Sequence, residues 1–298
     1  MENEEIQNKE EKSEHKNGAL WDLLYNMREN EVNFESPVNL NISKMKEIRF
    51  PDIIWHHYDV VPKKVKLTNN GNTVIMSIRF FQDRPYITGG PLLGNYVFSQ
   101  VHFHWGCNDM EGSEHTIDGT QYPIEMHIVH FKSAYITQET ALTEKDGVVV
   151  LVYFFKLQSH SNPAFEGLIA SLRNIRKANT SIKLEALPLN FLIHTFSSDY
   201  FIYWGNIRTS TNTHTIMWIV CREPFGISAE QTAKFRKLRD MQDEPLVRTF
   251  RTIESTDSKQ IFHVNPSESK YSTLLPIWCN AEIEKKRKYS KRQSNLEK

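Results

Sequence analysis

The 298-residue chain carries 36 Lys and Arg residues against 36 Asp and Glu residues, so its formal net charge at neutral pH is zero. Its apolar content of 39% is ordinary for a soluble globular protein, and a neutral chain has no overall field that favours nucleic acid or an anionic membrane. The longest apolar run, Val148–Phe155, is too short to span a bilayer, and the acidic N-terminus lacks the apolar core of a secretory signal. These features predict a cytoplasmic protein that binds neither nucleic acid nor membrane.

Three cysteines, Cys107, Cys221 and Cys279, are too few and too scattered for a disulfide scaffold. One disulfide is possible, but free thiols in a reducing compartment are expected.

Residues 1–18 are almost all polar or charged and are predicted to form a disordered arm. Residues 19–281 are long enough for one large domain, and all-β folds often have this length. Residues 282–298 are strongly basic and are predicted to be a solvated tail. A nuclear-localisation signal or a binding segment for an acidic partner is the alternative for this tail.

In chain order, strands are predicted where short apolar runs are separated by turn residues such as Asn69-Asn70-Gly71-Asn72. The predicted strands are Val65–Thr68, Val74–Phe81, Tyr96–Trp105, Glu125–Phe131, Val148–Phe155 and Ile216–Cys221. Helices are predicted at Phe165–Ala178, which is amphipathic, and at Ser228–Asp240, which opens with a capping box from Ser228 to Gln231. Many strands, few helices and no internal repeat indicate one mainly β domain with a few surface helices.

The strand Tyr96–Trp105 holds the chemically most informative motif. Side chains alternate along a strand, so Gln100, His102 and His104 share one face. A neighbouring strand with Glu125 and His127 on one face would bring a third imidazole to the first two. Three neutral imidazoles around one point are the ligand set of a catalytic zinc ion, which keeps its fourth position for water.

Two histidines separated by one residue on a half-buried strand usually bind no metal, so the pair alone does not establish a metal site. A metal-bound His normally donates its other N–H to a carboxylate, an amide or a backbone carbonyl. Gln100 and Glu125 each lie two residues from a proposed ligand on the same strand face, where they could orient it. These five positions together predict Zn²⁺ bound by His102, His104 and His127.

The sequence resembles the alpha-class carbonic anhydrases, whose signature is F-H-F-H-W-G, then G-S-E-H-T, then E-L-H-L-V-H. The matching segments are Val101–Gly106, Gly112–Thr116 and Glu125–His130, and similarity extends from about Glu35 to about Val220. The resemblance implies the family's large, twisted, mostly antiparallel central sheet in one domain with helices on its surface. It also implies a zinc lyase, most simply a monomer, that interconverts carbon dioxide and bicarbonate.

The resemblance further implies an apolar pocket for carbon dioxide beside the metal. The implied pocket residues are Val129, Val150, Ile207, Ile216 and Trp218, and all five are apolar. Taken singly, each could simply fill the core; taken together, they favour the pocket.

Two departures from the family pattern predict slow turnover. In active members a Thr accepts a hydrogen bond from the zinc-bound hydroxide and donates one to the Glu of G-S-E-H, which is Glu114 here. Counting back from Trp218 without a gap places Arg208 at this Thr and Thr209 at the next position, although a one-residue slip would let Thr209 take the role. An arginine cannot accept the proton but could pair with Glu114 or hold an anion, and losing one positioned group costs about 10²-fold in rate.

The second departure concerns proton export. Fast members carry a His after the Asn-Gly of the cavity mouth, whereas this chain has Asn72, which cannot titrate near neutral pH. Near the C-terminus the family's Arg-Pro-x-Gln-Pro-Leu is missing, and Val264-Asn265-Pro266 lies roughly at its place.

The first hypothesis is therefore a slow zinc-dependent carbonate dehydratase. The second is a carbonic-anhydrase-related binding protein that keeps zinc but has little or no turnover. Arg208 and Asn72 favour the second hypothesis, and the complete set of three histidines favours the first. A third hypothesis is ester hydrolysis at the same site.

Overall fold

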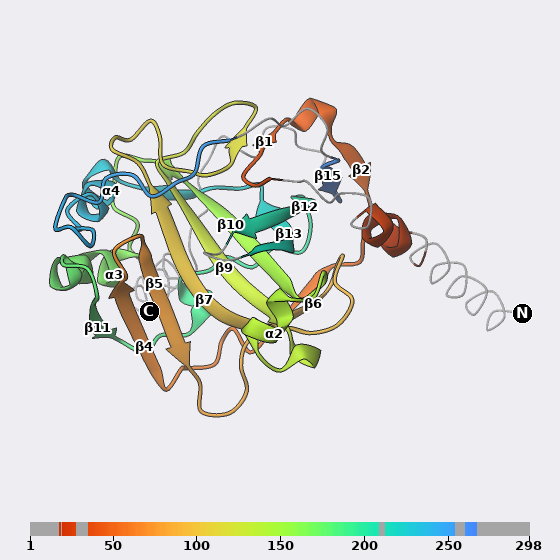
Figure 1. Cartoon of the computed structure of the whole chain (residues 1–298), viewed down its shortest axis with the longest axis horizontal. Coiled ribbons are helices and arrows are strands. Elements are labelled where there is room, and N and C mark those ends of the chain that lie inside the picture. The colour runs from red at the N-terminus through yellow and green to blue at the C-terminus, as the bar shows by residue number, and fades with distance from the viewer. Residues whose placement is uncertain (1–17, 19, 28–34, 209–211, 254–259, 267–298) are drawn as a thin grey trace, which may run out of the picture.

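A computed structural model describes residues 18, 20–27, 35–208, 212–253 and 260–266. The described chain is built around one 13-stranded sheet whose main path runs in the order β11-β4-β5-β7-β9-β10-β13-β12-β15-β2 (Figure 1). The strands of this path are β2 (Lys46–Ile48), β4 (Lys64–Asn69), β5 (Val74–Arg79), β7 (Tyr96–Trp105), β9 (Ile124–Lys132), β10 (Val148–Leu157), β11 (Thr180–Leu184), β12 (Tyr200–Arg208), β13 (Thr213–Cys221) and β15 (Phe262–Val264). Most pairings are antiparallel, and the parallel pairs include β10 with β13 and β15 with β2.

Smaller strands complete the sheet at its margins. These strands are β3 (Ile53–His56), β6 (Tyr86–Gly89) and β14 (Phe225–Ile227), and a separate two-stranded sheet is formed by β1 (Asn39–Leu40) and β8 (Thr116–Ile117). The predicted class, a mainly β domain around a large and mostly antiparallel sheet, is confirmed.

The centre of the sheet is buried on both faces. All of β10 except its last two residues and all of β9 except Lys132 are buried. β10 is accordingly a nearly continuous apolar run, whereas β9 also carries buried polar residues, Glu125, His127 and His130. Alternate residues of β10 enter two different hydrophobic clusters. Leu151 belongs to the larger cluster, under the helices, and Val150 belongs to the smaller cluster on the opposite face. The second face is the one that carries the site described below.

The helices are short and lie on the outside of the sheet (Figure 1). Besides a helix at residues 20–27, they are α2 (Gln138–Leu142), α3 (Glu166–Ser171) and α4 (Ala229–Phe235), with 3₁₀ turns η1 (Ile42–Lys44), η2 (Ser133–Tyr135), η3 (Leu172–Ile175) and η4 (Leu189–Phe191). The capping box between Ser228 and Gln231 is formed, so α4 begins where its sequence signal predicts.

Several predicted bounds are corrected by the structure. The helix expected at Phe165–Ala178 is α3 followed by η3, and it ends at Ile175. The helix expected to continue to Asp240 ends at Phe235. Among the strands, β5 ends at Arg79 and not at Phe81, whereas β10 and β13 are longer than predicted. No described helix is long and apolar enough to span a membrane.

Candidate metal centre

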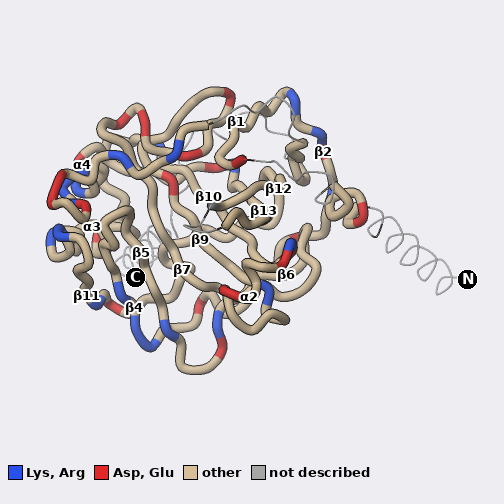
Figure 2. Tube along the Cα trace, in the orientation of Figure 1, with Lys and Arg blue, Asp and Glu red and all other residues tan. Residues whose placement is uncertain are grey.

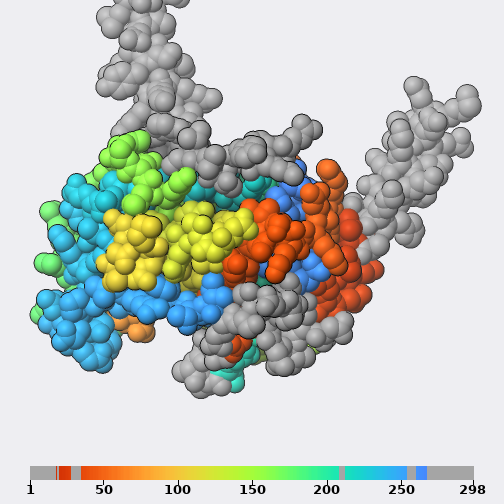
Figure 3. Space-filling model, turned by 90° about the horizontal axis from the view of Figure 1, so that it is seen from above, coloured from red at the N-terminus to blue at the C-terminus, as the bar shows by residue number. Residues whose placement is uncertain are grey.

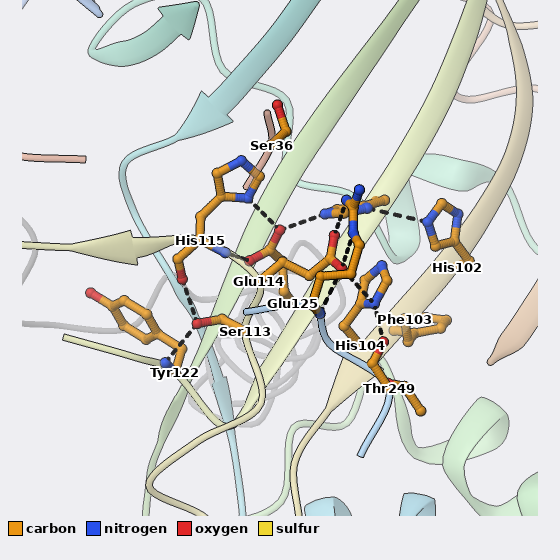
Figure 4. A network of polar contacts seen from close by, with 12 residues as sticks. Ser36, His102, Phe103, His104, Ser113, Glu114, His115, Tyr122, Glu125 and Thr249 are labelled. Carbon is orange, nitrogen blue, oxygen red and sulfur yellow. Dashed lines mark hydrogen bonds and ion pairs between the residues drawn. The ribbon is translucent and has the colours of Figure 1, made fainter. Parts of the chain in front are cut away.

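Three histidines meet on two neighbouring strands near the centre of the sheet, β7 and β9. His102 and His104 lie on β7, and His127 lies directly opposite His102 in the antiparallel pairing of β7 with β9. One ring nitrogen from each of the three lies within 4.8 Å of the other two (Figure 4). Nε2 of His102 and Nδ1 of His127 are 3.2 Å apart.

Hydrogen bonds behind the rings determine which nitrogens face one another. Nε2 of His127 lies 2.5 Å from a carboxylate oxygen of Glu125, so Nε2 donates and Nδ1 keeps its lone pair. Nδ1 of His104 donates to the backbone carbonyl of Thr249 at 2.9 Å, which leaves Nε2 of His104 deprotonated. These are the outer partners expected around histidines that bind a metal ion.

The lowered pKa values of His102 and His104 favour the binding of a cation. Burial, together with repulsion from His127 and His104, lowers the pKa of His102 well below its usual range. Burial also lowers the pKa of His104, although Glu114 counteracts part of this shift. Both imidazoles are thus neutral at pH 7, which is the form that binds metal.

Nε2 of His104 is also buried without a hydrogen-bond partner among the described residues. A buried nitrogen lone pair with no partner is costly unless a ligand satisfies it. The three residues therefore fit a Zn²⁺ ion with three protein ligands.

Glu125 links the metal ligands to a second buried histidine. Its two oxygens accept hydrogen bonds from the backbone N–H of His115 at 2.8 Å and from Nδ1 of His115 at 2.7 Å. Burial alone would raise the pKa of Glu125, but His115 and His127 outweigh it and lower the pKa to about 2. Nε2 of His115 lies 2.6 Å from the hydroxyl of Tyr203, which in turn lies 3.3 Å from the hydroxyl of Ser36.

Glu114 is the second buried carboxylate, and its partner is Arg251, which was not among the predicted site residues. Arg251 donates from Nε to Oε1 of Glu114 at 2.8 Å and from Nη2 to Oε2 at 2.7 Å, and its backbone N–H donates to Oε1 at 3.1 Å. Burial would raise the pKa of Glu114, but His104 and Arg251 hold it well below its usual range. The carboxylate is 3.6 Å from Nδ1 of His104, so this ion pair touches the metal site.

The position of Arg251 corrects the interpretation of the C-terminal quarter. Thr249 and Arg251, not Val264-Asn265-Pro266, reach the site, while β15 pairs with β12 and β2 at the edge of the sheet. Figure 3 shows the blue segment near residue 250 against the yellow segment that connects β7 to β9. The only local signal was the arginine of Thr249-Phe250-Arg251, which lacks the proline that follows it in the family pattern.

The five residues predicted to line the pocket are brought together. Val129, Val150, Ile216 and Trp218 belong to the hydrophobic cluster on the metal side of the sheet, and Ile207 packs against it. The ring of Trp218 lies 5.1 Å from that of His127 and 4.9 Å from that of His115, between centroids. An apolar wall therefore stands directly beside the three histidines.

The remaining predicted residues have different outcomes. Gln100 lies on the metal side, but its buried Oε1 accepts no hydrogen bond from any described residue, so the orienting contact to His102 is not formed. Asn72 is exposed in the turn between β4 and β5, where Gly71 adopts a φ of +87°. Arg208 is the last residue of β12, and its side chain lies outside the described part of the structure, as does Thr209.

This arrangement defines a class of protein: a metalloenzyme-type fold with three histidines on neighbouring strands near the centre of a β-sheet and an apolar wall beside them. A family model for eukaryotic-type carbonic anhydrases matches residues 11–265, and the chain belongs to this family. Carbonic anhydrase 3 of Homo sapiens is 32% identical over 234 residues, which cover 76% of this chain and 88% of that protein. Carbonic anhydrase 7 of Mus musculus is 32% identical over 219 residues, which cover 73% of this chain and 81% of that protein.

Proposed function

We propose that this protein catalyses the reversible hydration of carbon dioxide to bicarbonate and a proton, with Zn²⁺ bound by His102, His104 and His127. The single observation that carries the proposal is the convergence of three ring nitrogens, with Glu125 and Thr249 fixing the protonation of His127 and His104 from behind. When bound there, zinc supplies a Lewis acid that makes water a nucleophile near neutral pH.

The chain's own residues supply binding and orientation. Carbon dioxide is small and apolar, so the wall of Val129, Val150 and Trp218 can hold it next to the histidines without hydrogen bonds. Ile207 and Ile216 close the same wall. Glu125 and the carbonyl of Thr249 keep the imidazoles oriented, and Glu114 is kept ionised by Arg251.

We propose that turnover is slow, for two reasons. Arg208 at the place of the family's threonine cannot accept a hydrogen bond, so it cannot orient the attacking water as a hydroxyl would. Asn72 carries no titratable group, so the proton must leave through buffer or by another route. The one-residue shift that would bring Thr209 into this role is the alternative for the first of these features.

A zinc-retaining binding protein with little or no turnover is the second candidate. One observation favours it: Arg251 already donates to both oxygens of Glu114. In an active enzyme this carboxylate would accept a hydrogen bond from the threonine hydroxyl that orients the nucleophile. The two candidates share the metal site and differ only in turnover.

Stopped-flow measurement of carbon dioxide hydration by the zinc-loaded chain tests the proposal, with His127→Ala as the blank and Arg208→Thr as the gain-of-function variant. We expect slow hydration above buffer by the parent, none by His127→Ala, and an increase of about 10²-fold in kcat by Arg208→Thr. The binding-protein candidate is supported instead if parent and Arg208→Thr both bind one zinc ion and neither exceeds the buffer rate.

We also propose that the protein acts as a monomer in the cytoplasm. The free thiols of Cys107 and Cys221 support a reducing compartment, while Cys279 lies outside the described residues.

A further inference from the structure

The face of the sheet that carries the three histidines is divided into an apolar half and a cationic half. Residues directly opposite each other in a pairing point to the same side of the sheet, so the register defines a continuous row across the strands. From one edge inward, the row next to the histidines consists of Lys183, Lys66, Ser77, Gln100, Val129, Val150 and Trp218. It is cationic on β11 and β4, polar on β5 and β7, and apolar from β9 onward.

Two more cations extend the charged half of this face. Lys64 on β4 is opposite Arg79 on β5, and both are two residues along their strands from Lys66 and Ser77. Lys64, Lys66, Arg79 and Lys183 are exposed, and we call these four residues the cationic strip. Figure 2 shows Lys and Arg along β11 and β4, on the side of the sheet away from β12 and β13.

The cationic strip carries uncompensated charge. None of its four members forms an ion pair with a described acidic residue. Of the residues that come immediately after β4, β5 and β11, Glu185 alone is acidic. Lys183 opposite Lys66, and Lys64 opposite Arg79, are like-charge pairs, which destabilise a sheet. In a chain with no net charge, these four residues are a local excess of cations on this face of the sheet.

The distance to the metal site is short enough for electrostatic guidance. Neighbouring strands are about 4.8 Å apart, so Lys66 on β4 lies roughly 10 Å from β7, and Lys183 lies about one strand further out. The Debye length is about 8 Å at physiological ionic strength and about 30 Å at 0.01 M. The strip therefore acts on an anion at the metal strongly at low salt and weakly at high salt.

We propose that the cationic strip is an anion-steering surface that concentrates small anions, bicarbonate among them, at the metal site. This inference rests on the proposed function, because it requires a metal ion at the three histidines.

Equilibrium anion binding is the appropriate test. The equilibrium constant of the overall reaction fixes the ratio of kcat/KM in its two directions, so no variant can change one direction alone. The metal is therefore replaced by cobalt(II), whose visible absorption reports ligand binding. The protein is then titrated at pH 8.5 with thiocyanate, an anion, and with imidazole, which is neutral at this pH.

The test variant is K64Q/K66Q/R79Q, and the matched control is R173Q/K177Q/K237Q, which removes three exposed cations on or next to η3 and α4, away from the metal side. At about 0.01 M ionic strength we expect thiocyanate to bind the test variant roughly threefold to tenfold more weakly than the parent, with the difference vanishing near 0.5 M. Imidazole should bind the parent and both variants equally, and thiocyanate should bind the control as it binds the parent.

Two results would overturn the inference in distinguishable ways. If cobalt binds but thiocyanate affinity is the same in parent and test variant at low salt, or falls equally in the control, the steering role is wrong while the metal site stands. If the parent binds no cobalt at the three histidines, the proposed function and the inference fall together.

Discussion

Arg251 and Lys234 have side chains of equal exposure, 41%, but very different acidic partners. Glu114, the partner of Arg251, is 1% exposed, whereas Glu230, the partner of Lys234, is 78% exposed. Removing one member of a buried pair leaves a charge without compensation, and the cost is about 3–5 kcal/mol. An exposed pair contributes less than about 1 kcal/mol. The same loss of a cation should therefore have different consequences at the two positions.

We predict that Arg251→Gln lowers the free energy of unfolding by about 2 kcal/mol, less than a fully buried pair because Arg251 is partly exposed. Lys234→Gln should change it by less than about 0.5 kcal/mol. The folded protein lowers the pKa of Glu114 below its ordinary 4.5. The stability lost in Arg251→Gln should therefore be complete above pH 4.5 and should shrink as the pH falls below 4.5. Urea denaturation of both variants and the parent at pH 7.5 and 4 measures this. Equal losses for the two variants at pH 7.5 would contradict it.

Glu125 and Gln100 received the same predicted role, but the structure distinguishes them. Glu125 bonds to His127, while Oε1 of Gln100 has no partner among the described residues. We predict that Glu125→Gln weakens zinc affinity about 10–100-fold, as loss of an outer partner usually does, and that Gln100→Ala changes it less than about threefold. Competition with a chromophoric chelator measures both. A tenfold loss in Gln100→Ala would show that Gln100 orients His102 once the metal is bound.

At the scale of elements, β9 carries two histidines that face opposite sides of the sheet. His127 faces the metal side, while His130, three residues later, faces the main core, where its Nε2 lies 2.5 Å from the hydroxyl of Tyr58. Burial lowers the pKa of His130 to about 3. In the unfolded chain the pKa of His130 is near 6.5. Between pH 6.5 and about 3, His130 is therefore protonated in the unfolded chain and neutral in the folded chain.

This difference predicts the direction of a pH effect. Stability should be complete above pH 6.5 and should fall by about 1.4 kcal/mol per pH unit as the pH drops toward 3. Other groups titrate in the same range, so the measurement is the difference between the parent and His130→Gln in urea denaturation at pH 7.5, 6.5, 5.5 and 4.5. The difference should shrink steadily below pH 6.5, whereas His160→Gln, at an exposed position, should leave the slope unchanged. A constant difference across the four pH values would show that His130 does not titrate between the two states.

The elements that the sequence predicted well are those whose own residues determine them. β7 was predicted with the observed bounds because Tyr96–Trp105 alternates in burial over most of its length, and α4 was found through its capping box. β12 was missed as a strand because Tyr200–Asn206 is buried on both faces and contains Gly205, so it shows no alternation. Strands of two to five residues at the sheet margins, such as β3 and β15, depend on their partners and leave little local signal.

At the scale of the whole molecule, the metal site was predictable to the extent that its residues are close in sequence. His102, His104 and His127 lie on neighbouring strands joined by one connection, so alternation and pairing were enough to place them together. Thr249 and Arg251 follow the metal ligands by more than 120 residues, and the path that returns them to the site depends on the packing of the entire domain. No local pattern predicts such a contact.

Because the three histidines belong to two neighbouring strands near the centre of the sheet, a metal ion bound there should stabilise the whole fold. Binding to the folded state alone adds about 4 kcal/mol when free zinc is 1,000 times its dissociation constant, or roughly 10 °C in Tm for a domain of this size. We expect zinc to raise the Tm and a chelator to reverse the rise, in thermal unfolding followed by circular dichroism. His104→Ala should abolish the response, whereas His56→Ala, a change at a ring that stacks on Tyr86, should keep it. A rise in Tm that persists in His104→Ala would place the stabilising zinc elsewhere on the protein and would separate the site of the three histidines from the ion that the family normally binds.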